Sequence, residues 1–172
     1  VYAFKGDVYS GLDAYTIQDD KFEYLQKTLR IISGYYGILR PFDKILPYRL
    51  EMGTRLENEN GNNLYKFWGD KITDVLNDDI EDNDIVVNLA SDEYSKSINK
   101  EKLNAEIITP VFKEFKNDSY KVIAIYAKKA RGLMSRFLIE RKSKNVDDIK
   151  LFNTDGYTFD DNLSTENELV FT

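Results

Sequence analysis

Between Ser33 and Gly53 the chain reads SGYYGILRPFDKILPYRLEMG, a stretch with too much glycine and proline for one helix or strand. The apolar run over residues 29–32 just before it predicts a buried strand, and Ser33-Gly34 ends that strand. Pro41 and Pro47 each bias the preceding residue away from helix. We therefore expect an ordered loop after the first strand, at the kind of strand end where open α/β sheets bind ligands.

This loop holds side chains that suit a binding site. Arg40, Tyr48, Arg49 and Glu51 all lie within it, and ordered loops often carry functional residues. The alternative is that glycine and proline only shape a turn while the tyrosines fill the core. The residues alone leave both interpretations open.

Composition limits the chemistry of the protein. A length of 172 residues with 42% hydrophobic side chains predicts a single domain over residues 1–172 with a substantial core. The chain has no cysteine and no histidine, which excludes thiol catalysis, Cys/His zinc sites and imidazole acid–base chemistry. We predict no metal site and no cofactor. No apolar run approaches the ~20 residues of a membrane span, and no signal peptide opens the chain, so we expect a cytoplasmic protein without membrane contact.

Charge is segregated along the chain. The net charge is −6, yet residues 120–144 hold eight Lys or Arg against one Glu, and residues 30–55 hold five against two. This distribution predicts a basic surface on an acidic body. The alternative is that basic and acidic segments neutralise each other once the chain folds.

Hydrophobic patterns place the other elements. They predict helices over residues 18–28, 64–77 and 128–142, a short helix after Ser91, and strands over 29–32, 85–89, 106–115 and 120–127. Asn63 is a typical N-cap, and Pro110 is expected to interrupt its strand. The predicted fold class is α/β of the mixed α+β kind. It has a central mixed sheet flanked by helices, the ordered Gly/Pro-rich loop after the first strand, and an antiparallel hairpin near 106–127.

The helix over 128–142 is expected to bury one face and to expose a basic one. That basic face carries Lys128, Lys129, Arg131 and Arg136. Gly132 lies among these cations and leaves room for a backbone or a phosphate to approach. A solvated basic face is the simpler alternative.

Asn88 and Ser91 follow the strand over residues 85–89 and form a second place where a ligand can meet a strand end. Ser91 also suits the N-cap of the next helix, and Asn88 suits a turn. A purely structural role for both residues therefore stays open.

Five blocks of sequence carry a resemblance to a known family. They are Phe4–Leu12, Leu29–Pro41, Pro47–Gly53, Asn88–Tyr94 and Ala127–Met134. In order and spacing they resemble the YaaA family of peroxide-stress proteins, and they run through nearly the whole chain. Members of that family begin with a strand and a Ser-Pro-Ala-Lys segment upstream of the Lys-Gly-Asp block. That part is absent here, so we expect this chain to lack the N-terminal part of the family domain.

The resemblance implies a cytoplasmic α/β protein that protects bacteria from hydrogen peroxide and limits damage from intracellular iron. It also implies a basic cleft that binds DNA, with a helix–hairpin–helix-like element. Because the chain has no cysteine or histidine, protection would not use thiol scavenging or imidazole-bound iron. Whether the family has a catalytic activity is left open.

Two functional hypotheses follow. In the first, a monomer binds duplex or branched DNA, with cations contacting phosphates and tyrosines stacking on exposed bases. Its expected nucleic-acid or anion-binding residues are Lys5, Arg40, Tyr48, Arg49, Asn88, Ser91, Lys128, Lys129, Arg131 and Arg136. In the second, the same cleft is the active site of an enzyme for a nucleotide or another phosphorylated small molecule, with Asp7 or Glu51 as candidate acid or base. A partner-binding domain, in which these side chains scatter, is a third interpretation.

Overall fold

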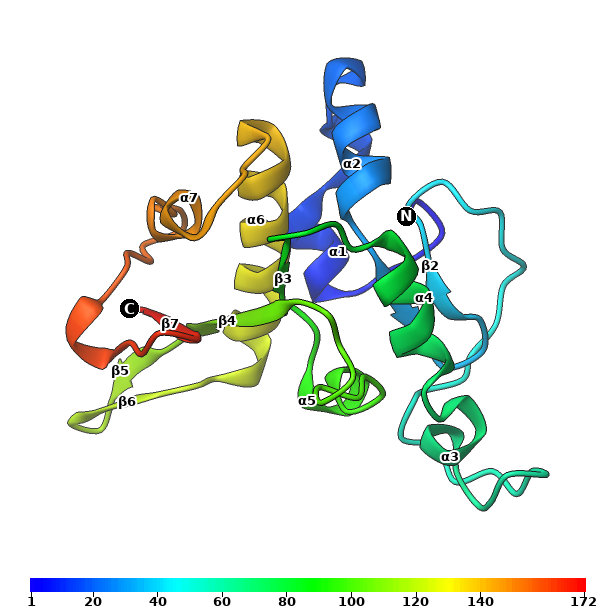
Figure 1. The fold of residues 1–172 in the computed structure, drawn as a ribbon. Coiled ribbons are helices and arrows are strands. Elements are labelled where there is room, and N and C mark those ends of the chain that lie inside the picture. Colours follow the sequence, from blue (N-terminus) through cyan, green and yellow to red (C-terminus); the bar gives the residue numbers. More distant parts are fainter.

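The computed structural model describes residues 1–172 as a mixed α/β fold, which confirms the predicted class (Figure 1). The α-helices are α1 (Asp7–Leu12), α2 (Phe22–Thr28), α3 (Leu64–Trp68), α4 (Lys71–Asp79), α5 (Asp92–Ser95), α6 (Ala124–Arg141) and α7 (Val146–Lys150). The 3₁₀-helices are η1 (Ala14–Thr16), η2 (Asp19–Lys21) and η3 (Asp161–Leu163). The strands are β1 (Ile31–Ser33), β2 (Gly37–Leu39), β3 (Ile85–Val87), β4 (Glu106–Phe112), β5 (Glu114–Lys116), β6 (Ser119–Lys121) and β7 (Glu168–Phe171).

The strands form three small sheets instead of the one central mixed sheet predicted. The largest has the order β3-β4-β7 and is parallel throughout. The first half of β4 pairs with β3 and the second half with β7, so the sheet is staggered. The first predicted strand is present as β1, but it pairs antiparallel with β2 and does not join the parallel sheet.

Pro110 does not interrupt β4, contrary to the prediction. Thr109 and Lys113 donate backbone hydrogen bonds toward β7, so the nitrogen of Pro110 faces the opposite edge. There β3 has already ended, and the last bond on that side runs from Asn88 N–H to the Ile108 carbonyl. A proline without an N–H is tolerated at such an unpaired edge position.

The antiparallel hairpin predicted near 106–127 is present but shorter, as β5 and β6. Residues 106–112 belong to the parallel sheet, and α6 begins at Ala124, earlier than the expected start at residue 128. Alternation of apolar residues over 122–126 therefore did not mark a strand. Val122, Ile125 and Tyr126 are exposed, so no sheet pairing was available to stabilise an extended backbone there.

Helix α6 is packed on more than one side, whereas the sequence predicted one buried face. Ala127, Ala130 and Met134 belong to the core beneath the parallel sheet, while Ile139 belongs to a second core around α1 and α2. Gly132, expected on the exposed basic face, is instead buried against α1. Figure 1 shows α6 between the parallel sheet and the N-terminal helices.

The helix predicted over 64–77 is two helices, α3 and α4. Asn63 caps α3 as predicted, because its side chain accepts a hydrogen bond from the N–H of Lys66. Gly69 then takes a positive φ of 51° and ends α3. Trp68 is only half-buried; its ring packs on Gly37 and its indole N–H donates to the carbonyl of Gly34. None of the helices combines the length and apolarity that crossing a bilayer requires.

Candidate functional site

The loop that follows β1 is held by a cluster of tyrosines. The hydroxyl of buried Ser33 accepts a hydrogen bond from the N–H of Tyr36 at 3.0 Å and is hydrogen-bonded to the hydroxyl of Tyr48. The rings of Tyr35, Tyr36 and Tyr48 lie 4.9 to 5.5 Å apart. Aromatic contacts at these distances fix the rings, so Tyr48 is rigidly placed while its neighbour Arg49 stays exposed.

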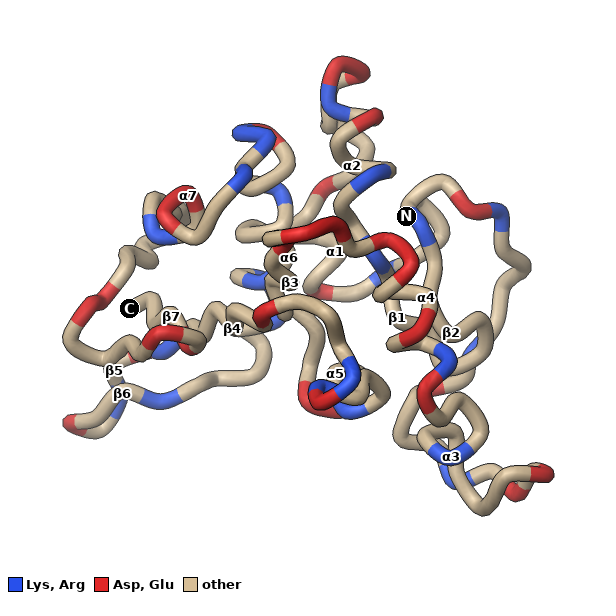
Figure 2. Tube along the Cα trace, viewed as in Figure 1, with Lys and Arg blue, Asp and Glu red and all other residues tan.

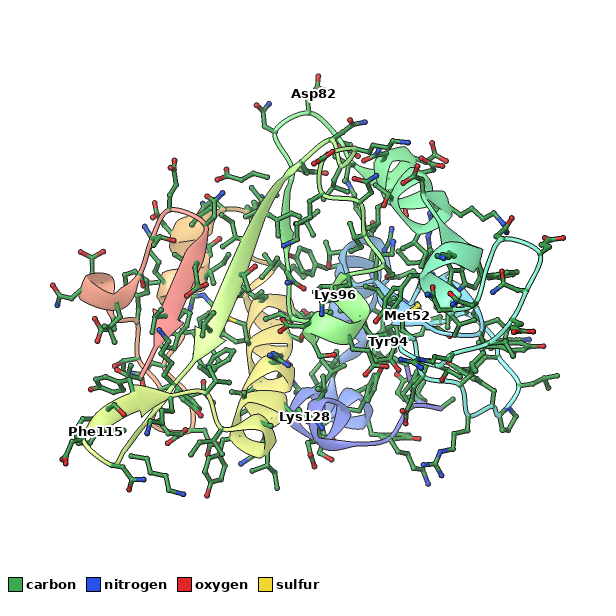
Figure 3. All side chains as sticks on the ribbon, turned by 90° about the horizontal axis from the view of Figure 1, so that it is seen from below. Met52, Asp82, Tyr94, Lys96, Phe115 and Lys128 are labelled. Atoms are coloured by element: carbon green, nitrogen blue, oxygen red, sulfur yellow. The ribbon has the colours of Figure 1, made fainter.

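The other end of the same loop is tied to α5. The Glu93 carboxylate accepts a hydrogen bond from the N–H of Gly53 at 2.7 Å, and the Glu93 carbonyl accepts one from the Tyr65 hydroxyl at 2.8 Å. Figure 3 shows α5, with Tyr94 and Lys96 labelled, between α6 on one side and Met52 on the other. The loop after β1 and the turn before α5, which the sequence predicted as two separate ligand sites, are therefore neighbours.

That turn is self-contained. The side-chain oxygen of Asn88 accepts a hydrogen bond from the N–H of Ala90 at 3.2 Å, as an Asx turn does. Ser91 occupies the N-cap position of α5, but its hydroxyl makes no capping hydrogen bond. Asn88 thus has a structural role, and the Ser91 hydroxyl is not used by the helix it precedes.

A close crossing of α1 and α6 places the next two residues. Gly11 and Gly132 face each other so tightly that a Cβ on Gly132 would lie 1.9 Å from the carbonyl oxygen of Val8. This contact fixes Tyr9, which follows Val8 on α1, and Arg131, which precedes Gly132 on α6. The backbone approach predicted beside Gly132 is therefore made by α1.

The hydroxyls of Tyr9, Tyr48 and Tyr94 lie near enough to affect one another, and Arg131 lies on α6 at the crossing with the helix of Tyr9. We call these residues the Tyr–Arg cluster: Tyr9, Tyr48, Tyr94 and Arg131. Burial raises the pKa of the Tyr9 hydroxyl far above its usual value, and the nearby hydroxyls of Tyr48 and Tyr94 add to this effect. Burial also raises the pKa of Tyr94, with contributions from Glu93, Tyr48 and Glu51. The hydroxyls of Tyr9 and Tyr94 therefore stay protonated at neutral pH and remain hydrogen-bond donors.

Arg131 is the cation of the cluster. Burial lowers the pKa of its guanidinium, and the negative charge of Asp92 opposes that shift. Arg131 takes part in none of the ion pairs or side-chain hydrogen bonds that hold the chain together, whereas Arg30, Arg40 and Arg136 all do. A half-buried guanidinium without a bonded partner is costly, and an anion bound beside it would offset that cost.

Three of the predicted cations are engaged inside the protein. Arg40 pairs with Asp79 at 2.6 Å, alongside Arg30, and so ties the end of β2 to α4. Lys129 pairs with Asp155 at 2.9 Å. Arg136 pairs with Glu140 and donates three further hydrogen bonds to Asp13 and Thr16 at 2.7 to 3.1 Å.

The other predicted residues are accessible. Lys5 lines a cavity of about 310 Å³ that also includes Tyr9. Lys128 is exposed on α6, one turn before Arg131, and Asp7 and Glu51 are exposed as well. No set of three or more acidic side chains is arranged to hold a metal ion.

Sequence reasoning missed Tyr9, Asp92 and Tyr94. Tyr9 lies within the Phe4–Leu12 block, but its neighbours in the sequence do not distinguish it from a tyrosine of the core. Asp92 and Tyr94 directly follow Ser91, so a signal was present: a polar turn after a strand, followed by an acid and a tyrosine.

Comparisons with known proteins agree on one family. The family described as peroxide stress protein YaaA matches residues 1–163. UPF0246 proteins of Aliivibrio fischeri strain MJ11 and of Idiomarina loihiensis are 55% and 54% identical to this chain over 99% of its length. The chain spans 67% of the length of each of these relatives. The chain therefore belongs to the YaaA family of peroxide stress proteins.

Proposed function

We propose that this protein acts in peroxide stress by binding DNA, with phosphates held at the Tyr–Arg cluster. Arg131 contacts a phosphate, and the accessible cations Lys5, Arg49 and Lys128 extend the contact. The observation that carries the proposal is the half-buried guanidinium of Arg131, which has no bonded partner in the protein. Hydroxyls of the neighbouring tyrosines donate to the same phosphate.

The net charge of the chain restricts the proposed DNA contact to the surface around the Tyr–Arg cluster. A net charge of −6 repels a polyanion at long range, so binding depends on a few local cations. Three of the ten predicted residues, Arg40, Lys129 and Arg136, already have carboxylate partners. The duplex contact is therefore small, and we expect few released counterions.

Bound DNA is the target that this protein protects from iron and peroxide. The chain has no cysteine and no histidine, so peroxide is not consumed by a thiol. Coverage of DNA keeps hydroxyl radicals formed by iron and peroxide from the strands it occupies. The cytoplasm is the compartment in which this protection operates.

Titration of duplex and branched DNA at several salt concentrations tests this function. Each phosphate neutralised contributes roughly 0.9 to the slope of log affinity against log salt for duplex DNA. Arg131→Ala should weaken binding and reduce that slope by about one contact. Lys27→Ala is the matched control, because Lys27 is an exposed cation on α2 paired only with Glu81. The proposal would be refuted by an affinity for DNA that does not change with salt concentration, or by equal losses of affinity in the two variants.

An enzyme for a phosphorylated small molecule is the second candidate. It is favoured by the half-buried position of Arg131, which suits one phosphate better than a long duplex. Asp7 and Glu51 are the candidate acid and base, and Glu51 lies close enough to raise the pKa of Tyr94. A thermal-shift screen of phosphorylated metabolites tests it: a hit in the wild type that Arg131→Ala abolishes supports this candidate, and no hit argues against it.

A further inference from the structure

The β5–β6 hairpin and the first turn of α6 form an exposed aromatic surface that the proposed duplex contact does not use. We call it the hairpin patch, and it consists of Phe115, Tyr120, Val122, Ile125 and Tyr126. Each of these side chains is 45% to 66% exposed. Figure 1 shows the hairpin extending from the body of the protein, and Figure 3 shows Phe115 at its outer end.

Two rings of the patch are fixed side by side. Phe115 and Tyr120 are directly opposed across the two strands, with ring centroids 5.3 Å apart in an edge-to-face arrangement. Tight turning at Asn117 and Asp118, both with positive φ near 55°, holds the two strands together. The rings thus keep their positions without being buried.

Lysines alternate with these rings along the two strands, so the side chains of Lys116 and Lys121 leave from the opposite face of the hairpin. Lys113, Lys116 and Lys121 lie on or beside the hairpin strands, and Lys116 and Lys121 are exposed. Two acids lie nearby: Glu114, whose carboxylate accepts a hydrogen bond from the hydroxyl of Tyr157, and Asp118 at the turn, so three lysines stand against two carboxylates. Figure 2 shows basic residues along the hairpin and an acidic one at its tip. This local excess of positive charge stands out on a chain whose net charge is −6.

We propose that the hairpin patch binds single-stranded nucleic acid, with unpaired bases stacked on Phe115 and Tyr120 and lysines along the strand backbone. Exposed aromatic rings interleaved with cations are the usual combination for unpaired strands, because every base has a face that can stack. Charge complementarity favours this occupant over an apolar protein partner. The site is separate from the Tyr–Arg cluster, so it extends the proposed function to unpaired DNA or RNA.

Fluorescence anisotropy with a labelled oligo(dT) tests the inference. Phe115→Ala and Tyr120→Ala should each weaken oligo(dT) binding roughly tenfold, and Phe115→Leu should also weaken it because a branched aliphatic group cannot stack. Phe115→Trp should retain binding. Thermal unfolding should be little changed in all four variants, since both side chains are largely exposed.

The outcomes separate the two sites. Arg131→Ala should weaken duplex binding and leave oligo(dT) binding unchanged, whereas Phe115→Ala should do the reverse. If the wild type binds oligo(dT) but no duplex DNA, the proposed function is refuted and the hairpin inference still stands. If a variant unfolds, the hairpin patch is tested by photocrosslinking bromodeoxyuridine-substituted oligo(dT) to the wild-type protein. Adducts are expected on Phe115 or Tyr120.

Three results would overturn the inference. The first is the absence of oligo(dT) binding, and the second is equal oligo(dT) affinity in the wild type and Phe115→Ala. The third is a concentration-dependent dimer, seen by analytical ultracentrifugation, that Phe115→Ala makes monomeric, since the patch would then join two copies of the chain.

Discussion

Replacing Gly132 with alanine should destabilise the protein, although alanine favours a helix by about 1 kcal/mol over glycine. The new Cβ would lie 1.9 Å from the carbonyl oxygen of Val8 and 2.8 Å from the nitrogen of Leu12. Both contacts are with backbone atoms of α1, so no side chain can rotate away. The two helices would have to separate by about 1 Å, in an interior packed as densely as an organic crystal.

Overpacking of this kind costs typically ~1–3 kcal/mol, and the backbone clash places Gly132→Ala at the upper end of that range. Subtracting the ~1 kcal/mol gained in helix propensity leaves a net loss of about 2 kcal/mol. For a chain of this size that loss corresponds to a Tm lower by ~4–8 °C. Gly11→Ala should behave similarly, because its Cβ would lie 2.3 Å from the carbonyl oxygen of Lys129.

Thermal and urea unfolding followed by circular dichroism measures this loss. Ser10→Ala is the control, because Ser10 is exposed on α1 and the change affects only helix propensity. The double variant Gly11→Ala/Gly132→Ala should cost less than the sum of the single changes, since one separation of the helices relieves both clashes. An unchanged or higher Tm for Gly132→Ala would show that the two helices do not cross here.

Three other perturbations report on the charged groups. Arg136→Ala should lower stability by about 2 kcal/mol in urea unfolding, and Arg136→Lys nearly as much, because a lysine cannot reproduce the forked hydrogen bonds. Burial raises the pKa of the Asp79 carboxyl, but the hydrogen bonds and positive charges of its two arginine partners outweigh burial, so the pKa is lowered on folding. The stability that Asp79 contributes is therefore present above about pH 4 and is lost as the pH falls through the folded pKa. Acid unfolding curves of the wild type and of Asp79→Asn should converge at low pH. Arg131→Met should raise the Tm while weakening DNA binding, because it removes a half-buried guanidinium that bonds no group in the protein; a lower Tm would contradict the assignment of Arg131 as a ligand-binding cation.

The sequence was informative where a pattern is local. Asn63 was identified as a cap because three residues decide the N-cap hydrogen bond, and the class of fold followed from apolar runs of the right length. The length of β4 could not be predicted from local sequence. Pro110 predicts a break in the strand unless one knows that β3 has already ended at that position. The role of Gly132 likewise depended on a second glycine far away in sequence, at position 11.

The candidate site shows the same limit. Arg40, Arg131 and Arg136 look alike in the sequence, since each is a cation that was expected to bind an anion. The fold brings Asp79 to Arg40, whereas Glu140 lies one helical turn from Arg136 in the sequence, and Arg131 is left without a bonded partner. Tyr9 and Tyr94 were missed because their hydroxyls come near each other only in the folded chain.

The staggered parallel sheet has a consequence for how the protein is made. β7 is the last strand in the sequence, yet Phe171 packs against Phe112 and Phe152 in the main core. More than fifty residues separate β4 from the strand that completes its pairing. A nascent chain therefore cannot close this core until residues 168–171 have left the ribosome, and until then β4 presents an open edge on which chaperones or other nascent chains can act.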